Sequence, residues 1–155
     1  MDYREAKKLA EEARDLSLKL QSQAKLSKEE ESQMITSAQA GVFIWSRAGT
    51  SLQVARAHWL ASRAFCRLEE GRFALLHAQL CDFHTKQSGD RRDFDEAYAM
   101  EALARAAALR GDVENGMRLK KEAIALCEKI RDLQEKAIFK EHFEKMSWFH
   151  LEEKK

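Results

Sequence analysis

Proline is absent from this chain of 155 residues, and glycine occurs only six times. Proline interrupts the hydrogen bonding of helix interiors, and glycine supplies the tight turns that a sheet needs. The scarcity of both therefore favours long uninterrupted helices over a sheet with many turns. The chain is long enough to bury a hydrophobic core without disulfides or a structural metal. We expect a single all-α domain that covers residues 1–155.

Cysteine and long apolar runs are also scarce. The three cysteines, Cys66, Cys81 and Cys127, are odd in number and form no CxxC pair, which argues against a disulfide framework and for reduced, mostly buried thiols. No apolar run approaches the roughly 18 residues of a membrane span. The N-terminal stretch MDYREAKKLAEEARD is charged throughout, unlike a secretion signal. These features predict a cytoplasmic protein.

Net charge and catalytic motifs are the remaining absences. Lys and Arg total 27 and Asp and Glu total 26, so no strong field attracts nucleic acid or anionic lipid, and we expect neither as a partner. The chain has no glycine-rich phosphate loop, no HExxH and no GxSxG motif. The acid/base combination that can be constructed is His58 near Glu101 on the adjacent helix pair. We therefore expect no enzyme, no catalytic residue and no cofactor.

Helix-start signals recur along the chain, each a capping residue followed three positions later by Glu or Gln: Ser27 with Glu30, Thr50 with Gln53, Asp93 with Glu96, and Asp132 with Glu135. Gly49, Gly71, Gly89 and Gly111 stand where apolar periodicity ends, as left-handed residues after a helix would. Together these signals predict seven helices, over residues 2–25, 28–48, 51–70, 72–88, 93–110, 112–131 and 132–152. Short connections make neighbouring helices antiparallel. Leu76, Leu80 and Phe83 share one face of the fourth helix and are expected in the core.

A shift of 40 residues aligns two copies of a helix, a glycine turn and a second helix. The aligned pairs are Ala57 with Ala97, Leu60 with Met100, Ala64 with Ala104, Gly71 with Gly111, Phe73 with Val113, and Leu76 with Gly116. Ala64 and Ala104 fall in the middle of their helices. There, a small side chain lets the two helices of a pair cross closely.

The stretch LARAAALRGDVENGMRLKKEA, residues 103–123, resembles a tetratricopeptide repeat. The matching positions are Leu103, the small residue Ala104, the turn at Gly111 and Asp112, and the small residues Gly116 and Ala123. The copy from Trp59 to Phe83 matches less well. The spacing is longer than the roughly 34 residues of that repeat, and its usual proline is missing. The phrase DFDEAYAMEALARA also resembles segments of uncharacterised bacterial helical-repeat proteins, so the chain looks tetratricopeptide-like (TPR-like) and bacterial in style.

The resemblance implies a right-handed stack of antiparallel helix pairs (a TPR-like α-α superhelix). The first helix of each pair would line a concave groove that binds peptides or protein segments. By position, the ligand-binding residues would be His58, Ser62 and Phe65 from the third helix and Tyr98, Glu101 and Arg105 from the fifth. The last three also follow i, i+3, i+7 spacing, so they share one helix face. The alternative for that face is solvent exposure, with an ion pair between Glu101 and Arg105.

His77, Cys81 and His84 lie on one stripe of the fourth helix, and their side chains suit zinc. However, His77 and His84 are two turns, about 10 Å, apart on a straight helix. Histidines hydrogen-bonded at a contact between repeats, with Cys81 as a small hydrophobic residue, are the favoured interpretation. We assign no metal site, and metal binding by these three residues stays an alternative.

The predicted last helix carries more aromatic surface than one neighbouring helix covers. Phe139, Phe143, Met146, Trp148 and Phe149 are therefore expected to form an interface for a protein partner or a homodimer, the alternative being a cap folded onto the sixth helix. Together, these features predict a non-catalytic protein-interaction scaffold that binds a peptide or protein segment in a concave helical groove. The alternative is a small-molecule or metal-binding regulatory protein, and an enzyme is the weakest alternative.

Overall fold

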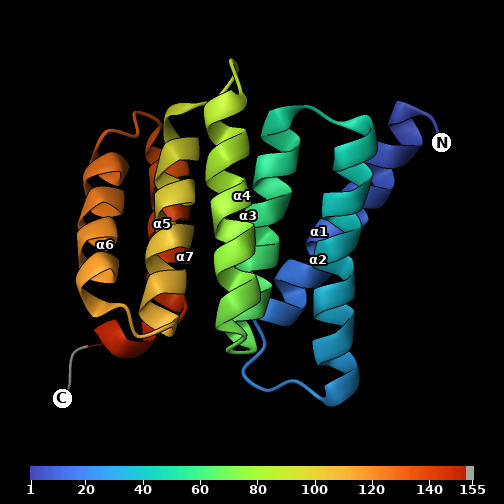
Figure 1. Cartoon of the computed structure of the whole chain (residues 1–155). Helices are drawn as coiled ribbons and strands as arrows, with labels where there is room; N and C mark the ends of the chain where they lie inside the picture. The colour runs from blue at the N-terminus through green and yellow to red at the C-terminus, as the bar shows by residue number, and fades with distance from the viewer. Residues whose placement is uncertain (153–155) are drawn as a thin grey trace.

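The structure, a computed structural model, describes residues 1–152. Within these residues it contains seven α-helices, one short 3₁₀ helix and no strand, so the predicted all-α class is confirmed (Figure 1). The elements are α1 (Tyr3–Gln21), α2 (Lys28–Ala48), α3 (Ser51–Arg67), α4 (Gly71–Gln87), α5 (Asp93–Leu109), α6 (Val113–Glu128), α7 (Leu133–Lys145) and the 3₁₀ helix η1 (Phe149–Leu151). The first six helices end within a few residues of their predicted bounds.

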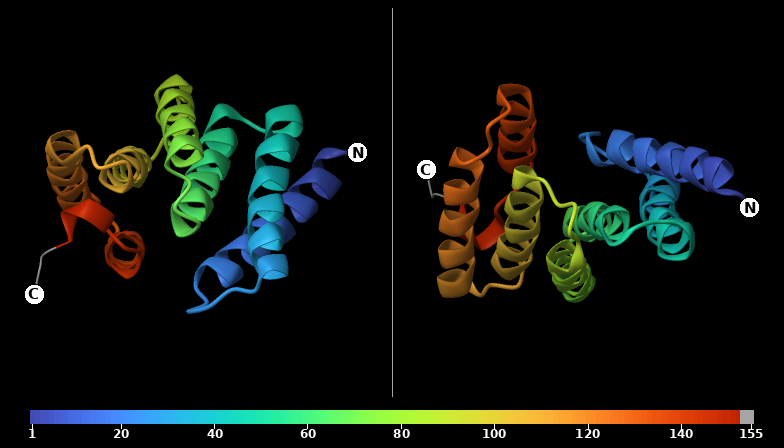
Figure 2. Two further views of the ribbon diagram at one scale, coloured as in Figure 1. Left: turned by 60° about the horizontal axis from the view of Figure 1, so that its bottom comes forward. Right: turned by 90° about the horizontal axis from the view of Figure 1, so that it is seen from above.

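The helices pack as consecutive antiparallel pairs. α1 packs on α2, α3 on α4 and α5 on α6, and neighbouring pairs meet through α2 with α3 and α4 with α5. In addition, α1, α3, α5 and α7 contact one another in succession. Figure 2 shows α1 and α7 on the same side of the stack, with α3 and α5 between them. The first helices of successive pairs therefore share one face of the molecule.

Helix N-termini are set by local capping. The predicted boxes at Ser27 and Thr50 are confirmed, and Asp132 accepts a hydrogen bond from the backbone N–H of Glu135. The predicted cap at Asp93 is wrong by one residue. Arg92 occupies the N-cap position of α5, and its backbone N–H donates to the carboxylate of Asp95. Asp93 instead begins α5 and accepts from the backbone N–H of Arg131.

The two central helix pairs repeat at a period of 42 residues, not 40. Glu69 (φ 56°) and Gly111 (φ 82°) hold the same left-handed position after α3 and α5. The next residue in each turn makes the same bond, from Glu70 N–H to the Phe65 carbonyl and from Asp112 N–H to the Ala107 carbonyl. Of the four glycines expected in this conformation, only Gly111 adopts it. Gly71 begins α4 instead.

Small and hydroxyl-bearing residues mark the helix crossings. The Ser17 hydroxyl donates to the Met34 carbonyl in the first pair, and the Ser62 hydroxyl donates to the Ala74 carbonyl in the second. In the third pair, a Cβ atom placed on Gly116 would lie 3.6 Å from the Ala104 carbonyl oxygen. The backbones of each pair therefore approach closely.

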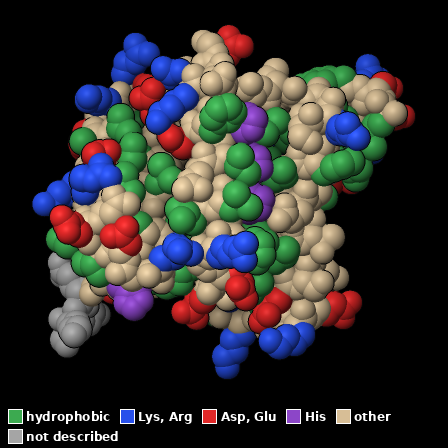
Figure 3. Space-filling model, in the orientation of Figure 1, with side chains coloured by type: hydrophobic (Ala, Val, Ile, Leu, Met, Phe, Trp, Pro, Cys, Tyr) green, Lys and Arg blue, Asp and Glu red, His purple; other side chains and the backbone are tan. Residues whose placement is uncertain are grey.

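The core face of α4 is also made of small residues, and the prediction for this helix is wrong. Leu76 is 47% exposed, Phe83 is 54% exposed and Leu80 is half-buried. The buried residues of the helix are Ala74, His77, Ala78, Cys81 and Thr85. Close packing on α3 and α5 selects small side chains, so the large apolar ones point outward. Figure 3 shows apolar side chains and a row of histidines on this outer surface.

The end of the chain differs from the predicted seventh helix. α7 stops at Lys145, and the following segment turns back so that η1 packs on α5 and α6. Phe139 and Trp148 are buried, and three further residues are half-buried within the same packing, namely Phe143, Met146 and Phe149. The expected exposed aromatic interface is therefore wrong. This apolar surface is covered within the chain, as a cap would be, because the segment after α7 folds back onto the stack.

Candidate functional site: a groove along α1, α3, α5 and α7

Two adjoining cavities lie along the face formed by α1, α3, α5 and α7. The first, the Trp59 cavity, has a volume of about 350 Å³ and is lined by Arg56, Trp59 and Tyr98, among others. The second, the Arg63 cavity, has a volume of about 860 Å³ and lies toward the C-terminal ends of α1, α3 and α7. Leu18 and His142 line both cavities. Together the cavities make a groove along the face that the first helices of successive pairs share.

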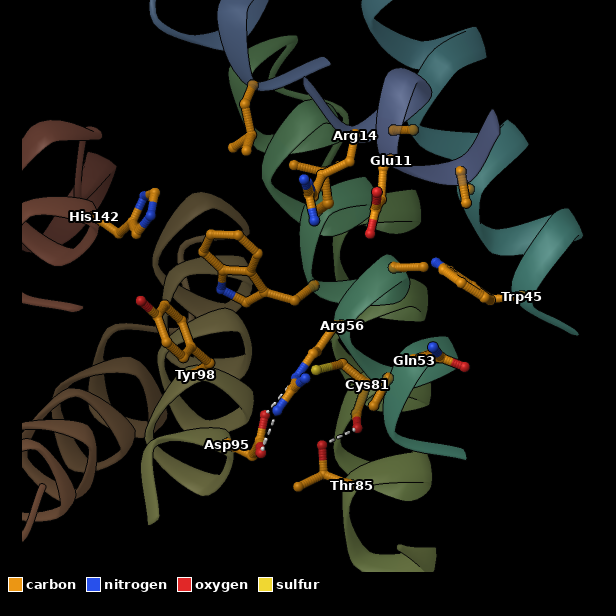
Figure 4. A pocket seen from close by; sticks show the side chains of 18 of the residues that line it. Glu11, Arg14, Trp45, Gln53, Arg56, Cys81, Thr85, Asp95, Tyr98 and His142 are labelled. Atoms are coloured by element: carbon orange, nitrogen blue, oxygen red, sulfur yellow. Dashed lines mark hydrogen bonds and ion pairs between the residues drawn. The ribbon is translucent and has the colours of Figure 1, made fainter. Parts of the chain in front are cut away.

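The Trp59 cavity draws side chains from four helices. Figure 4 shows Glu11 from α1, Arg56 from α3, Tyr98 from α5 and His142 from α7 around one space. The Nε and Nη2 atoms of Arg56 each lie 3.0 Å from an oxygen of Asp95. Asp95 is buried, whereas the Arg56 side chain is 46% exposed. The ion pair therefore holds a guanidinium in a fixed orientation at the cavity.

Trp59 forms the wall between the two cavities with its aromatic neighbours. Its indole N–H donates to Oε2 of Glu101 at 2.8 Å, and its ring meets those of Tyr98 and His142 edge-on, with centroids 4.9 and 5.1 Å apart. Burial raises the pKa of Tyr98. Burial, followed by the charge of Arg63, lowers the pKa of His142. At neutral pH the wall thus offers an uncharged phenol and an uncharged imidazole.

A buried charge cluster supports this wall. Oε1 of Glu101 lies 2.7 Å from Nε of Arg105 and 3.1 Å from Nη1 of Arg63. Burial alone would raise the pKa of Glu101, but the charges of Arg105 and Arg63 outweigh it, and the pKa is lowered. Arg105 also donates to three backbone carbonyls at and beyond the end of α7, those of Phe143, Met146 and Ser147. The cluster therefore fixes the end of α7 against α5.

The fifth-helix residues predicted to share a ligand-binding face occupy two different environments. Tyr98 lines the Trp59 cavity, but Glu101 and Arg105 are each only 1% exposed and line neither cavity. The expected ion pair between Glu101 and Arg105 is present, yet it lies in the interior. Neither a groove-lining nor a solvent-exposed position is correct for these two residues, because the end of α7 covers them.

The third-helix residues predicted for the groove face α4 instead. Nδ1 of His58 lies 2.9 Å from Nδ1 of His77, the Ser62 hydroxyl donates to the Ala74 carbonyl, and the Phe65 ring stacks on that of His77. His58 and Glu101 are thus not brought together as an acid/base pair, because the carboxylate of Glu101 bonds to Trp59, Arg63 and Arg105.

The error in α3 comes from the assumed period. A shift of two residues turns a helix by about 200°, to its opposite face. A period of 42 instead relates Tyr98, Glu101 and Arg105 to Arg56, Trp59 and Arg63, the residues that do line the groove. The repetition of arginine at this period, Arg63 with Arg105, is the signal that could have found them.

His77, Cys81 and His84 belong to the contact between α2, α3 and α4. Nε2 of His77 lies 3.1 Å from Nε2 of Gln39, and the His84 ring stacks on that of His58, with centroids 5.6 Å apart. Burial raises the pKa of the Cys81 thiol to about 12. Within residues 1–152, no group of three or more His, Cys, Asp or Glu side chains is arranged to hold a metal ion. These residues therefore act in packing.

Comparisons with protein-family models, with curated proteins and with solved structures give no match to this chain. Among the helices of residues 1–152, none is both long enough and apolar enough to cross a membrane. The class that the fold and the site define is an all-α stack of antiparallel helix pairs with a groove along its first helices.

Proposed function

We propose that this protein is a non-catalytic interaction scaffold that binds a peptide or protein segment in the groove along α1, α3, α5 and α7. The observation that supports this most is the convergence of side chains from four helices, far apart in sequence, on the Trp59 cavity (Figure 4). A ligand there would contact several helix pairs at once. Binding energy is then spread over a rigid surface, as a peptide groove requires.

The chemistry of the groove suits a peptide. Trp and Tyr side chains supply large contact areas at low entropic cost and are enriched at interface hot spots. Arg56, which Asp95 holds in place, offers a guanidinium that needs little ordering on binding. The neutral Tyr98 phenol and His142 imidazole can hydrogen-bond to main-chain groups without a charge being desolvated. These properties favour recognition of a polypeptide over catalysis.

The class that fits this proposal is a tetratricopeptide-like repeat protein of the cytoplasm. Two helix pairs related by 42 residues, with equivalent left-handed turns at Glu69 and Gly111, support the repeat assignment. The three cysteines are free and buried, in keeping with a reducing compartment.

A small-molecule ligand is the second candidate. The Trp59 cavity, at about 350 Å³, falls in the size range of small-ligand sites, and it combines aromatic walls with a few polar groups. Native mass spectrometry of protein purified without chelator separates the two candidates. A bound small mass favours a regulatory ligand-binding protein, whereas its absence favours the scaffold.

Site-specific photo-crosslinking tests the scaffold. A photoreactive amino acid replaces Arg14, which lines the Trp59 cavity, or Arg118, an exposed residue of α6 that serves as the matched control. We expect position 14 to cross-link a segment of another protein in cells and position 118 not to do so. Arg56→Ala in the same background should abolish the cross-link. Equal cross-linking from both positions, or none from position 14, would refute the proposal.

A further inference from the structure

Two buried polar side-chain atoms in residues 1–152 have no hydrogen-bond partner, and both belong to residues that line the Arg63 cavity. They are Nε of Arg63, a donor, and Oε1 of Gln21, an acceptor. Leaving such an atom unpaired costs about 1 to 3 kcal/mol. Their common location on one cavity, with opposite hydrogen-bonding character, points to a ligand.

Arg63 is held in place while one edge of its guanidinium stays unused. The residue is 6% exposed, and both hydrogen bonds that it donates come from Nη1, to Oε1 of Glu101 and to the His142 carbonyl. The guanidinium also packs over the Trp59 ring. Nε therefore belongs to a side chain whose orientation is already fixed, and its N–H is available to an acceptor.

Gln21 is held in the same way from its amide nitrogen. Nε2 donates to the Ser17 hydroxyl at 3.1 Å and to the Leu60 carbonyl at 3.3 Å. These bonds connect Gln21 to α1 and α3, and they fix which end of the amide is the acceptor. Oε1 therefore needs a donor that neither helix supplies.

The pairing of a donor with an acceptor disfavours an anion. A carboxylate could accept from Arg63, but its lone pairs would face the lone pairs of Gln21 Oε1. Two other cations that line the cavity are already engaged, Arg67 with the carbonyls of Gln23 and Ala24, and Lys145 with Glu141. A neutral group that accepts one hydrogen bond and donates another fits better, and the peptide unit is such a group.

We propose that the Arg63 cavity is a main-chain subsite, in which Arg63 Nε–H donates to a carbonyl of an extended peptide and Gln21 Oε1 accepts from one of its N–H groups. This inference rests on the proposed function and deepens it, because it assigns part of the groove to sequence-independent recognition. Both atoms are covered in this conformation, so binding includes a side-chain rotation that turns them toward the cavity.

NMR titration of the full chain tests the subsite, because the Arg63 Nε–Hε cross-peak reports directly on the donor. The probes are N-acetylglycine methylamide, which carries two peptide units, its methyl ester, which lacks one N–H, propionamide and acetate. We expect saturable movement of the Arg63 peak with the methylamide and weaker binding of the ester. Movement with acetate or propionamide but not with the methylamide would overturn the main-chain assignment, and so would a stationary peak.

Two glutamine variants provide the matched comparison. Gln21→Leu removes the unpaired acceptor, whereas Gln23→Leu makes the same change at another residue of the same cavity. We expect Gln21→Leu to weaken methylamide binding about three- to tenfold, the worth of one hydrogen bond, and Gln23→Leu to leave it unchanged. Equal effects would refute the role of Gln21.

The cross-linking experiment keeps this inference separate from the proposed function. A partner that cross-links to position 14 while the Arg63 peak stays in place would leave the scaffold standing and remove the subsite. Movement of the peak with no cross-linked partner would leave an amide site and remove the scaffold.

Discussion

Replacing Glu101 by glutamine should destabilise this protein far more than an ordinary ion-pair mutation does. The carboxylate accepts from Trp59, Arg63 and Arg105 while only 1% exposed. Glutamine keeps the shape but removes the charge, so two buried guanidiniums lose their shared counterion. Removing one partner of a buried ion pair costs about 3 to 5 kcal/mol. We expect the free energy of unfolding to fall by about 3 kcal/mol, since glutamine retains one acceptor.

Glu122→Gln is the matched control. Glu122 pairs with Arg118 with the same i, i+4 spacing as Glu101 and Arg105, but the two side chains are 60% and 46% exposed. Exposed pairs of this kind contribute about 0.3 to 0.5 kcal/mol. Urea unfolding followed by circular dichroism measures both variants. If Glu101→Gln lies within about 0.5 kcal/mol of Glu122→Gln, the buried cluster does not carry the stabilisation argued here.

Three further perturbations test the packing. Burial, then the neighbouring His77 and His84, lowers the pKa of His58 to about 4 from 6.5. The unfolded chain therefore binds protons more strongly, and the urea midpoint should fall as pH drops from 6.5 toward 4; a midpoint independent of pH would contradict this. Ala104→Leu should overpack the crossing of α5 and α6 and cost about 1 to 3 kcal/mol, so a melting temperature at or above that of the wild type would count against that crossing. Glu69→Gly should raise the free energy of unfolding by about 0.5 to 1 kcal/mol because it relieves a left-handed backbone conformation, and thermal unfolding should show no gain if that strain is absent.

Most of the helices could be predicted from the sequence because their ends depend on neighbouring residues. The side chains of Ser27, Thr50 and Asp132 each cap a backbone N–H three positions away, and such a bond needs no partner from elsewhere in the chain. Asp93 was assigned wrongly because another acid two residues later, Asp95, competes for the same role and wins it.

The candidate site was predicted only in part, because helix faces are sensitive to register. A period wrong by two residues moved the prediction on α3 from Arg56, Trp59 and Arg63 to the face that packs on α4. The polar residues of α5 were recognised as unusual, but an isolated helix does not show whether such residues face solvent, a ligand or the interior.

The sequence by itself determined an all-α chain, the number of its long helices and most of their starts, since these follow from composition and from bonds within one turn. Only the tertiary structure decided which faces meet. The segment after α7 folds back onto α5 and α6, which buries Trp148 and turns Glu101 and Arg105 into an interior cluster. It also leaves Arg63 at the groove with an unpaired donor. That outcome depends on contacts between residues about 40 positions apart, such as Arg105 with the Met146 carbonyl, which no local pattern encodes.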